Sequence, residues 1–300
     1  MGDRINHLYG SLQKNYYSDG VKYGFNELFF KLDLINNFQP AFNSNLNKNA
    51  LEIGTGYFIV QPIILKLLGW EKILTVDITR DINYKAVRRQ LHYLLQDSYI
   101  SKIKKLSTLD SYEFSNIVEV LKISKTLDHI LEKCNIIYLA PYNFEDIEAY
   151  GIKFDFIFSQ VVLEHIPQDI LNKLFFYMKK WLKEDGYVVH IINFIDHFTN
   201  PGFFGDKKIP EFNFLQYSDK YWNFWAGNSI AYTNRLGYPY YYQLCRENNF
   251  KVLKFIEQNY KERKPFSIDK IHQDVISKYF KVNLDELVKV QRGAFLIGHK

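Results

Sequence analysis

The sequence predicts an α/β fold, in which short buried strands form a mostly parallel sheet and helices cover both of its faces. Its first signal is a buried strand at residues 50–53 that runs into a turn containing Gly54 and Gly56. A helix follows, with apolar residues at helical spacing from Ile63 to Leu68. The second signal is the return of apolar strands between amphipathic helices. These strands are expected at residues 72–77, 136–140, 154–160 and 187–194.

The turn after the first strand has the properties of a nucleotide-binding loop. Its two glycines let backbone approach a ligand closely, and the following helix presents unpaired N–H groups. A dinucleotide site would carry a third glycine three residues after Gly56, where this chain has Ile59. The acid Glu52, two residues before Gly54, instead suits a cationic ligand that bears an amino acid, such as S-adenosylmethionine.

This stretch resembles motif I of the class I S-adenosylmethionine-dependent methyltransferases. The resemblance rests on Glu52, Gly54 and Gly56, with Thr55 between the glycines, and it departs from the family where Phe58 replaces a common third glycine. It implies a Rossmann-like fold and S-adenosylmethionine as cofactor. The alternative is an ordinary glycine-rich turn of another α/β protein.

Composition sets limits on the class of protein. A chain of 300 residues, 47% hydrophobic and 17% aromatic, has room for one large α/β domain with insertions or for two smaller ones. The two cysteines, Cys134 and Cys245, are far apart in apolar contexts and are expected to be reduced core residues. No apolar run has transmembrane length, and the first residues form no apolar secretory core. A cytoplasmic protein is therefore expected.

The net charge of +5 is mild, and no block of lysine and arginine is long enough to indicate a nucleic-acid groove. No nucleic-acid partner is expected, and the small basic excess favours a phosphorylated or nucleotide-linked substrate. The sequence leaves the oligomeric state open.

The second strand ends in Asp77, about twenty residues after the glycines. An acid at this position can accept both ribose hydroxyls of an adenosine, whichever cofactor carries it. Asp77 and the adjacent Ile78 are therefore candidate cofactor-binding residues. The alternative is that Asp77 only caps a helix starting near Asp81.

Three segments lie outside the repeating strand and helix pattern. Residues 1–49 are expected to be an N-terminal helical segment, with a helix over 23–38, before a methyltransferase domain at 50–300. Residues 98–133 are longer than a usual connection and are expected to add about two helices as an insertion or cap. Residues 198–237 form an aromatic-rich insertion, interpreted as a lid or acceptor site.

The third strand leads into a loop that contains Asn143, Glu145 and Asp146. In the family that motif I resembles, this loop often carries an acid that accepts the adenine amino group. Asn143 is the candidate by position, because its side-chain carbonyl can accept that hydrogen bond. Glu145 and Asp146 remain alternatives.

The fourth strand carries a second resemblance to the same family, of the form F-D-x-I-x-S-x-x-V-L-E-H-I over residues 154–166. Ser159 and Gln160 are expected at the carboxyl end of this strand, where open α/β sheets bind ligands, and are assigned to the cofactor. His165 follows on the turn to the next helix and is a candidate general base, although the Glu-His pair also occurs in the family as a structural element.

A turn is expected at residues 183–186 and the fifth strand at 187–194, followed by Asp196 and His197. A carboxylate beside an imidazole can raise the pKa of the imidazole and fix its tautomer, which suits proton removal from a hydroxyl. His197 and Asp196 therefore join His165 as candidate catalytic residues.

Aromatic residues with interspersed Asn and Arg in the insertion at 198–237 are typical of sites that hold sugars and nucleotides. Asn234 and Arg235 are candidate substrate-binding residues for a phosphate or sugar oxygen. The order of these motifs also resembles methyltransferases of bacterial surface-polysaccharide biosynthesis. That resemblance implies O-methylation of a sugar, sugar phosphate or nucleotide sugar used for a capsule or O-antigen.

The last elements are expected to be a helix at 238–249, a strand at 251–258, a helix within 265–284 and a final strand at 288–299. They match the end of the family's fold, which implies a seven-stranded sheet with an antiparallel last strand.

A divalent metal is not expected. Related methyltransferases of ubiquinone synthesis carry an additional Glu three residues before the Glu-His pair, and here that position is Val161. Other functions stay open: methylation of a small molecule of secondary metabolism or quinone synthesis, a nicotinamide-dependent oxidoreductase, or a cofactor-binding module without catalysis.

Overall fold

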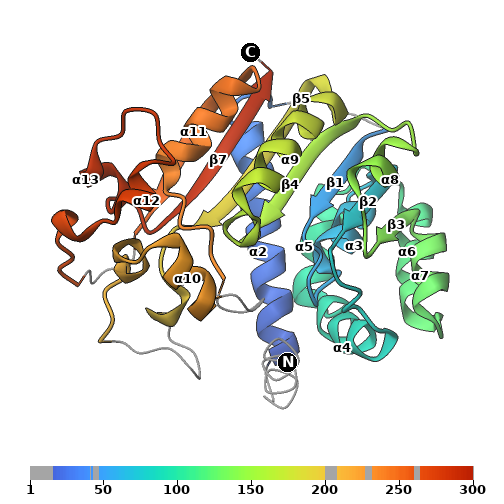
Figure 1. Ribbon diagram of the computed structural model, residues 1–300. Coiled ribbons are helices and arrows are strands. Elements are labelled where there is room, and N and C mark those ends of the chain that lie inside the picture. Colours follow the sequence, from blue (N-terminus) through green and yellow to red (C-terminus); the bar gives the residue numbers. More distant parts are fainter. Residues whose placement is uncertain are drawn as a thin grey trace. The chain divides into compact units, whose positions relative to one another are not determined.

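The computed structural model describes residues 16–40, 42, 47–199, 208–226, 232–259 and 264–299. Among these, residues 16–158 with 181–187 form one compact unit, here called the glycine-loop unit. Residues 159–180 with 188–299 form another, here called the histidine unit. Figure 1 shows the ribbon with its elements labelled.

The strands form one seven-stranded sheet in the order β3-β2-β1-β4-β5-β7-β6. β1 pairs with β2 and β2 with β3 in parallel, whereas β7 pairs antiparallel with both β5 and β6. The expected α/β fold, with a mostly parallel sheet and an antiparallel last strand inserted near its end, is confirmed. The strands are β1 Asn49–Ile53, β2 Lys72–Val76, β3 Ile136–Leu139, β4 Phe154–Gln160, β5 Leu182–Asn193, β6 Phe250–Gln258 and β7 Arg292–His299.

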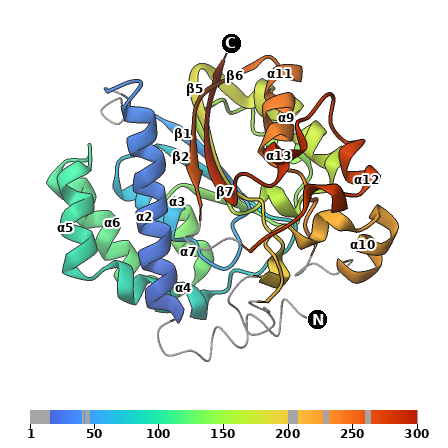
Figure 2. The ribbon, with the colours of Figure 1, turned by 90° about the vertical axis from the view of Figure 1, so that its left-hand side faces the viewer.

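The helices of the glycine-loop unit pack on one another and on its strands. α2 packs against α3 and α4 (Figure 2), and α7 packs on β3. α2 begins before the predicted start of the N-terminal helix, and the segment expected to hold about two helices holds three, α5 to α7. The bounds are α2 Tyr16–Asn36, α3 Val60–Leu67, α4 Tyr84–Leu94, α5 Asp97–Leu106, α6 Ser111–Ile123, α7 Leu127–Lys133 and α8 Phe144–Glu148.

In the histidine unit, α11 packs on β6 and on α13 (Figure 2). A separate apolar cluster joins the segment around Phe214 and Trp222 to residues near Val275 and Leu287. The region 265–284, expected to hold one helix, is divided into shorter ones. The bounds are η2 Leu163–His165, α9 Gln168–Trp181, η3 His197–Thr199, η4 Asn213–Gln216, α10 Asp219–Ala226, α11 Tyr238–Glu247, η5 Ile268–Lys270, α12 Gln273–Ile276 and α13 Leu284–Leu287.

One predicted turn is wrong. Residues 183–186 were expected to separate a helix from the fifth strand, but β5 already begins at Leu182. Lys183 forms an ion pair with Asp155 of β4 at 2.9 Å, and this contact holds the segment at the sheet. The sequence Lys-Glu-Asp-Gly has turn composition, but pairing with distant residues overrides local preference.

Candidate functional site

The turn after β1 has the backbone of a ligand-binding loop. Gly54 and Gly56 have φ values of 83° and 58°, in the left-handed region that favours glycine. The N–H groups of Gly54 and Thr55 donate to the carbonyl of Val76 in β2, at 2.8 and 3.2 Å. A Cβ at Gly56 would meet no atom within 4 Å, so the backbone of the turn is open on this side.

Asp77, directly after β2, reaches the same turn. Its Oδ2 accepts a hydrogen bond from the Gly56 N–H at 2.7 Å, and its Oδ1 accepts one from the Thr79 N–H at 3.3 Å. Partial burial raises the pKa of Asp77, although these hydrogen bonds oppose that effect. The adjacent Ile78 is 74% exposed, an unusual position for a large apolar side chain beside a polar loop.

Glu52 is buried in β1 and belongs to a polar network behind the turn. The Thr75 hydroxyl donates to Glu52 Oε2 at 2.6 Å, and the hydroxyls of Thr75 and Thr55 are 2.7 Å apart. Burial raises the pKa of Glu52 to about 8, while the Thr75 hydrogen bond and the charge of Lys31 act in the opposite direction. The network joins two of the predicted cofactor-binding residues, Glu52 and Thr55, through Thr75 of β2.

Gln90 of α4 forms hydrogen bonds with the backbone of the glycine turn. The sequence pattern alone did not identify this residue. Its Oε1 accepts from the Ile59 N–H at 3.0 Å, and its Nε2 donates to the Tyr57 carbonyl at 2.7 Å. The Ile59 N–H lies just before α3, where no side chain caps the helix. A signal was available: Gln90 lies three residues after Val87 and four before Leu94, on the buried face of the helix.

Phe58, which replaces the common third glycine, packs under α2. Its ring centroid lies 5.2 Å from that of Tyr16 and 6.3 Å from that of Tyr17. A Cβ at Gly20 would lie 2.2 Å from the Phe58 ring, so a larger residue at 20 would require the ring to shift. The departure from the family motif therefore has a structural basis within the glycine-loop unit.

The loop after β3 places Asn143 just before α8, exposed to solvent. The Asp146 carboxylate accepts from the Asn143 N–H at 2.7 Å, so Asp146 is used at the start of the helix. A contact of Asn143 with adenine stays a prediction.

The end of β4 belongs to the histidine unit. Ser159 is fully buried, and its hydroxyl lies 2.8 Å from Nδ1 of the buried His190 in β5. Gln160 is half-buried at the last position of the strand. Binding of the cofactor by either residue stays a prediction.

Glu164, His165 and His197 come together in the histidine unit. Their candidate ligand atoms all lie within 4.8 Å of one another, and the two imidazole centroids are 4.8 Å apart. Glu164 is 2% exposed; its Oε1 accepts from the Asn193 N–H at 3.3 Å, and its Oε2 has no hydrogen-bond partner among the described residues. Burial raises the pKa of Glu164 to about 8, partly offset by backbone hydrogen bonds and by the charge of Arg292.

The turn that carries Glu164 and His165 is fixed by the segment after α10. Asn234 donates through Nδ2 to the carbonyls of Leu163 and Ile166, at 2.8 and 2.9 Å, and through its backbone N–H to the Glu164 carbonyl at 2.8 Å. The Tyr232 carbonyl lies 2.9 Å from Nδ1 of His165. Asn234, expected to bind substrate, thus positions this turn, and its role in binding substrate stays a prediction.

Val161 gives the same turn an uncommon backbone. Its φ is 55°, in the left-handed region that β-branched residues rarely adopt. Its N–H donates to the Ile191 carbonyl of β5 at 2.8 Å. Backbone in such a conformation costs on the order of 1–3 kcal/mol and is often found at functional sites.

Asp196 is 1% exposed after β5 and stabilises the start of η3. Its Oδ1 accepts from the Phe198 N–H at 2.9 Å, and its backbone N–H donates to the Glu211 carbonyl at 2.7 Å. Burial raises the pKa of Asp196 to about 6, although hydrogen bonds oppose the rise. His197, the next residue, lies against His165 as described above.

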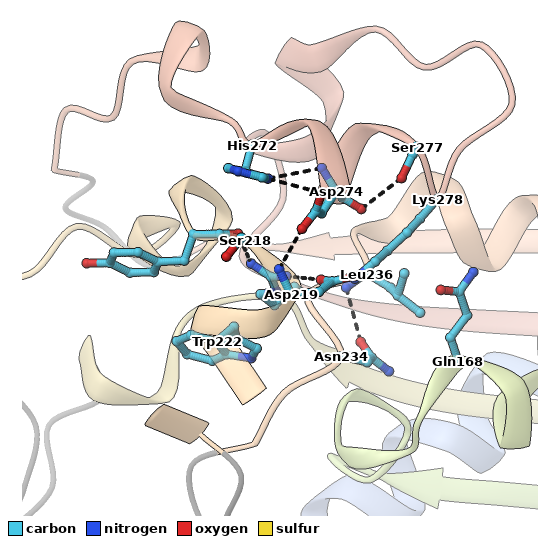
Figure 3. A network of polar contacts seen from close by, with 12 residues as sticks. Gln168, Ser218, Asp219, Trp222, Asn234, Leu236, His272, Asp274, Ser277 and Lys278 are labelled. Carbon is cyan, nitrogen blue, oxygen red and sulfur yellow. Dashed lines mark hydrogen bonds and ion pairs between the residues drawn. The ribbon is translucent and has the colours of Figure 1, made fainter. Parts of the chain in front are cut away.

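Arg235 is 2% exposed, and its guanidinium contacts groups of the chain itself. Nη1 donates to the carbonyls of Phe214 and Tyr217, at 3.0 and 2.5 Å, and Nη2 pairs with Asp219. Lys278 also pairs with Asp219, at 2.8 Å. Figure 3 shows this network, in which Asp274 and Lys278 surround Asp219. These contacts stabilise the histidine unit, and an additional role of Arg235 in substrate binding stays a prediction.

No helix in the described parts of the chain combines the length and the apolar character that crossing a membrane requires.

Comparisons with known proteins give likenesses of fold. No family model matches the sequence, and no curated protein matches it. Among solved structures, the chain is similar to PKMT2 from Rickettsia typhi in complex with AdoHcy, with 15% identity and a TM-score of 0.42 over 84% of this chain and 49% of that one. The chain thus spans about half the length of that protein.

Two other similar structures match over nearly their whole length. One is an S-adenosylmethionine-dependent methyltransferase from Clostridium acetobutylicum, with 11% identity and a TM-score of 0.47 over 99% of this chain and 98% of that one. The other is magnesium protoporphyrin IX methyltransferase from Synechocystis with bound SAH, with 11% identity and a TM-score of 0.46 over 99% and 93%. At these identities and TM-scores, the likenesses assign no activity, cofactor or substrate to this chain.

Proposed function

We propose that the protein is an S-adenosylmethionine-dependent O-methyltransferase that acts in the cytoplasm. The observation that carries the proposal is the hydrogen bond from the Gly56 N–H to Asp77 at 2.7 Å, because it brings the acid after β2 to the open glycine turn after β1. An adenosine bound there would find a carboxylate for its ribose hydroxyls beside backbone that it can approach closely. Motif I and the β4 motif supply the methyltransferase identity by resemblance.

The proposed cofactor contacts divide by chemistry. Asp77 accepts the ribose hydroxyls, and the exposed Ile78 offers an apolar face to the purine ring. Asn143 accepts the adenine amino group. Glu52, behind the turn, is the acid nearest in sequence to the glycines, and its carboxyl group is the proposed hydrogen-bond acceptor for the amino group of the amino acid part. The remaining proposed contacts are Gly54, Thr55, Gly56, Ser159 and Gln160.

Ile59 favours this cofactor over a dinucleotide. A pyrophosphate needs a small residue where strand, helix and phosphate come together. Here the corresponding position, three residues after Gly56, holds the buried side chain of Ile59.

The proposed reaction is an in-line displacement at the methyl carbon of the sulfonium. The enzyme must align the acceptor oxygen with that carbon and exclude water. A hydroxyl acceptor must also lose its proton at or near the transfer step. His165, Asp196 and His197 are the proposed catalytic residues for this task.

The proposed acceptor is a hydroxyl or a phosphoryl-linked oxygen of a sugar, sugar phosphate or nucleotide sugar. Support comes from the net charge of +5 and from the aromatic-rich segment around α10. Much of the predicted lid, at residues 200–207 and 227–231, lies outside the described residues. Its role over the acceptor, like that of Asn234 and Arg235, stays part of the proposal.

The test begins with binding of the cofactor. Titration calorimetry should show binding of S-adenosylmethionine and S-adenosylhomocysteine and no comparable binding of reduced nicotinamide dinucleotide. Label from methyl-labelled S-adenosylmethionine should then pass to one member of a panel of nucleotide sugars, sugar phosphates and polysaccharide fragments. Stronger binding of the nicotinamide cofactor would contradict the proposal. Label on a small aromatic or lipid acceptor alone would contradict the proposed acceptor class.

A further inference from the structure

We propose that Glu164, His165 and His197 bind a divalent transition-metal ion, such as Zn²⁺, that in turn binds the acceptor oxygen. The inference rests on the proposed function for its chemical role, and it specifies how the two histidines act. The sequence pattern predicts no metal, because it lacks an additional carboxylate at position 161. The structure supplies the third group from a different place, the loop after β5.

The donor set fits such an ion. Two imidazoles and one carboxylate are the three protein ligands of many catalytic zinc sites, and the same set also binds other divalent transition metals. Zinc bonds to these groups are about 2.0–2.2 Å long, so two ligand atoms of a tetrahedral site lie roughly 3.4 Å apart. The ligand atoms of this cluster lie within 4.8 Å of one another. Side-chain adjustments of less than about 1 Å would bring them to an ion.

Glu164 gives a second, independent reason. Its Oε2 is buried and has no hydrogen-bond partner in the described parts of the chain, although Oε1 is bonded to the Asn193 N–H. Leaving a buried acceptor without a partner costs stability, and a metal ion bound to Oε2 would remove that cost. The charge of Arg292 also reaches Glu164 and partly compensates its burial, so the bound ion must compete with that residue.

His165 is held as a ligand. Its Nδ1 lies 2.9 Å from the Tyr232 carbonyl, which can only accept, so Nδ1 carries the proton and the lone pair of the imidazole is on Nε2. Metal-binding histidines are commonly fixed in this way by a carbonyl on the other ring nitrogen. Asn234 fixes the same turn through two carbonyls, and Val161 before it has φ of 55°. The ligands are therefore positioned by surrounding structure, as a metal site requires.

Three protein ligands leave a position for the acceptor oxygen. Bound to the ion, the hydroxyl loses its proton to solvent more readily, because the ion stabilises the alkoxide. The oxygen then forms a bond to the methyl carbon while the carbon–sulfur bond breaks. The electron pair of that bond passes to sulfur and neutralises the sulfonium. The products are the methyl ether, S-adenosylhomocysteine and the released proton.

Metal binding can be measured without cofactor or acceptor. Protein without a histidine tag is stripped with chelator, dialysed against Zn²⁺ and assayed for bound zinc, and Co²⁺ is used in parallel because its visible spectrum reports coordination. The wild-type chain should bind one equivalent. Glu164→Gln and His197→Ala should each bind at least about 10–100-fold more weakly. His92→Ala is the control, because His92 is exposed on α4 in the other unit.

Each variant must first retain the circular dichroism spectrum of the wild type. Absence of zinc and cobalt binding by the wild type, or equal binding by all four proteins, would overturn the metal site. Methyl transfer that continues unchanged after chelation would overturn its role in the reaction and leave the histidines as bases. Zinc bound through these residues, with no methyl transfer to any acceptor, would support the metal site while the proposed function failed.

Discussion

Glu52 in β1 and Glu164 in η2 are both buried. They differ in the hydrogen bonding of one carboxylate oxygen, Oε2. Burial raises the pKa of each to about 8. Glu52 Oε2 receives the Thr75 hydroxyl at 2.6 Å, whereas Glu164 Oε2 has no partner among the described residues. The glycine-loop unit thus satisfies this carboxylate oxygen before a ligand arrives. The histidine unit leaves an acceptor unsatisfied, and we assign that acceptor to a ligand.

The largest expected effect comes from the histidine side of this comparison. His197→Ala should reduce methyl transfer by about 10²–10⁴-fold, because it removes either a base or a metal ligand near the acceptor. Affinity for S-adenosylmethionine should change little. Turnover with the acceptor identified by the label assay and calorimetry on the cofactor measure the two effects separately. A large loss of cofactor affinity would contradict the proposed role of His197 near the acceptor, because it would indicate that His197 contributes to cofactor binding.

The next effect belongs to the glycine-loop unit. Asp77→Ala should weaken cofactor binding by about 2–4 kcal/mol, roughly 30- to 1,000-fold, because a carboxylate that accepts both ribose hydroxyls is lost. Asp81→Ala is a matched control. The Asp81 carboxylate accepts a hydrogen bond from the Thr79 hydroxyl and forms none with the glycine turn among the described residues. Equal losses for both variants would mean that Asp77 acts only through general charge.

A smaller effect, on stability, tests whether Asn234 positions the turn of Glu164. Asn234→Ala should lower the free energy of unfolding by about 2–3 kcal/mol, because the carbonyls of Leu163 and Ile166 lose their donor in a buried place. Denaturant unfolding of the variant and of Asn248→Ala gives the comparison. Asn248 also donates to one carbonyl, that of Leu244, but is less buried. A similar loss of unfolding free energy in both variants would contradict the proposal that Asn234 positions the turn of Glu164.

The smallest effect is the pH dependence that Glu52 imposes. Since its folded pKa of about 8 lies above the ordinary 4.5, the folded chain binds more protons than the unfolded chain between these values. Stability from this group is present below about pH 4.5 and is lost as pH rises toward 8. The loss is at most about 1.4 kcal/mol per pH unit.

Glu52→Gln should therefore gain stability relative to the wild type as pH rises from about 5.5 to about 6.5, by about 1.3 kcal/mol. Thermal unfolding of both proteins across this range measures the difference, and the contribution of Glu164 is common to both. A constant difference between the two proteins would show that Glu52 does not titrate in this range.

The fold was largely predictable because its signals are local. The glycine turn, the acid at Asp77 and each short apolar strand are patterns that extend over only a few consecutive residues. The strands that they predict are present in the observed sheet. The turn expected at 183–186 was wrong because a contact with Asp155 decides that segment. Strand ends differed where pairing with distant residues sets the boundary.

The candidate site was predictable only in part. The place of Asp196 and His197 after a strand was predictable, and their catalytic role stays a prediction. The role of Asn234 depends on carbonyls about 70 positions away. Gln90 was missed because its partners lie in another element. Contacts between groups far apart in sequence leave no periodic pattern, so the metal-binding arrangement appeared only in three dimensions.

The contact between Gly20 and Phe58 links the sizes of two side chains. A Cβ at Gly20 would lie 2.2 Å from the Phe58 ring, so a larger residue at 20 requires the ring to shift or a smaller residue at 58. A side chain at 20 and an aromatic ring at 58 therefore compete for the same space between α2 and the glycine loop.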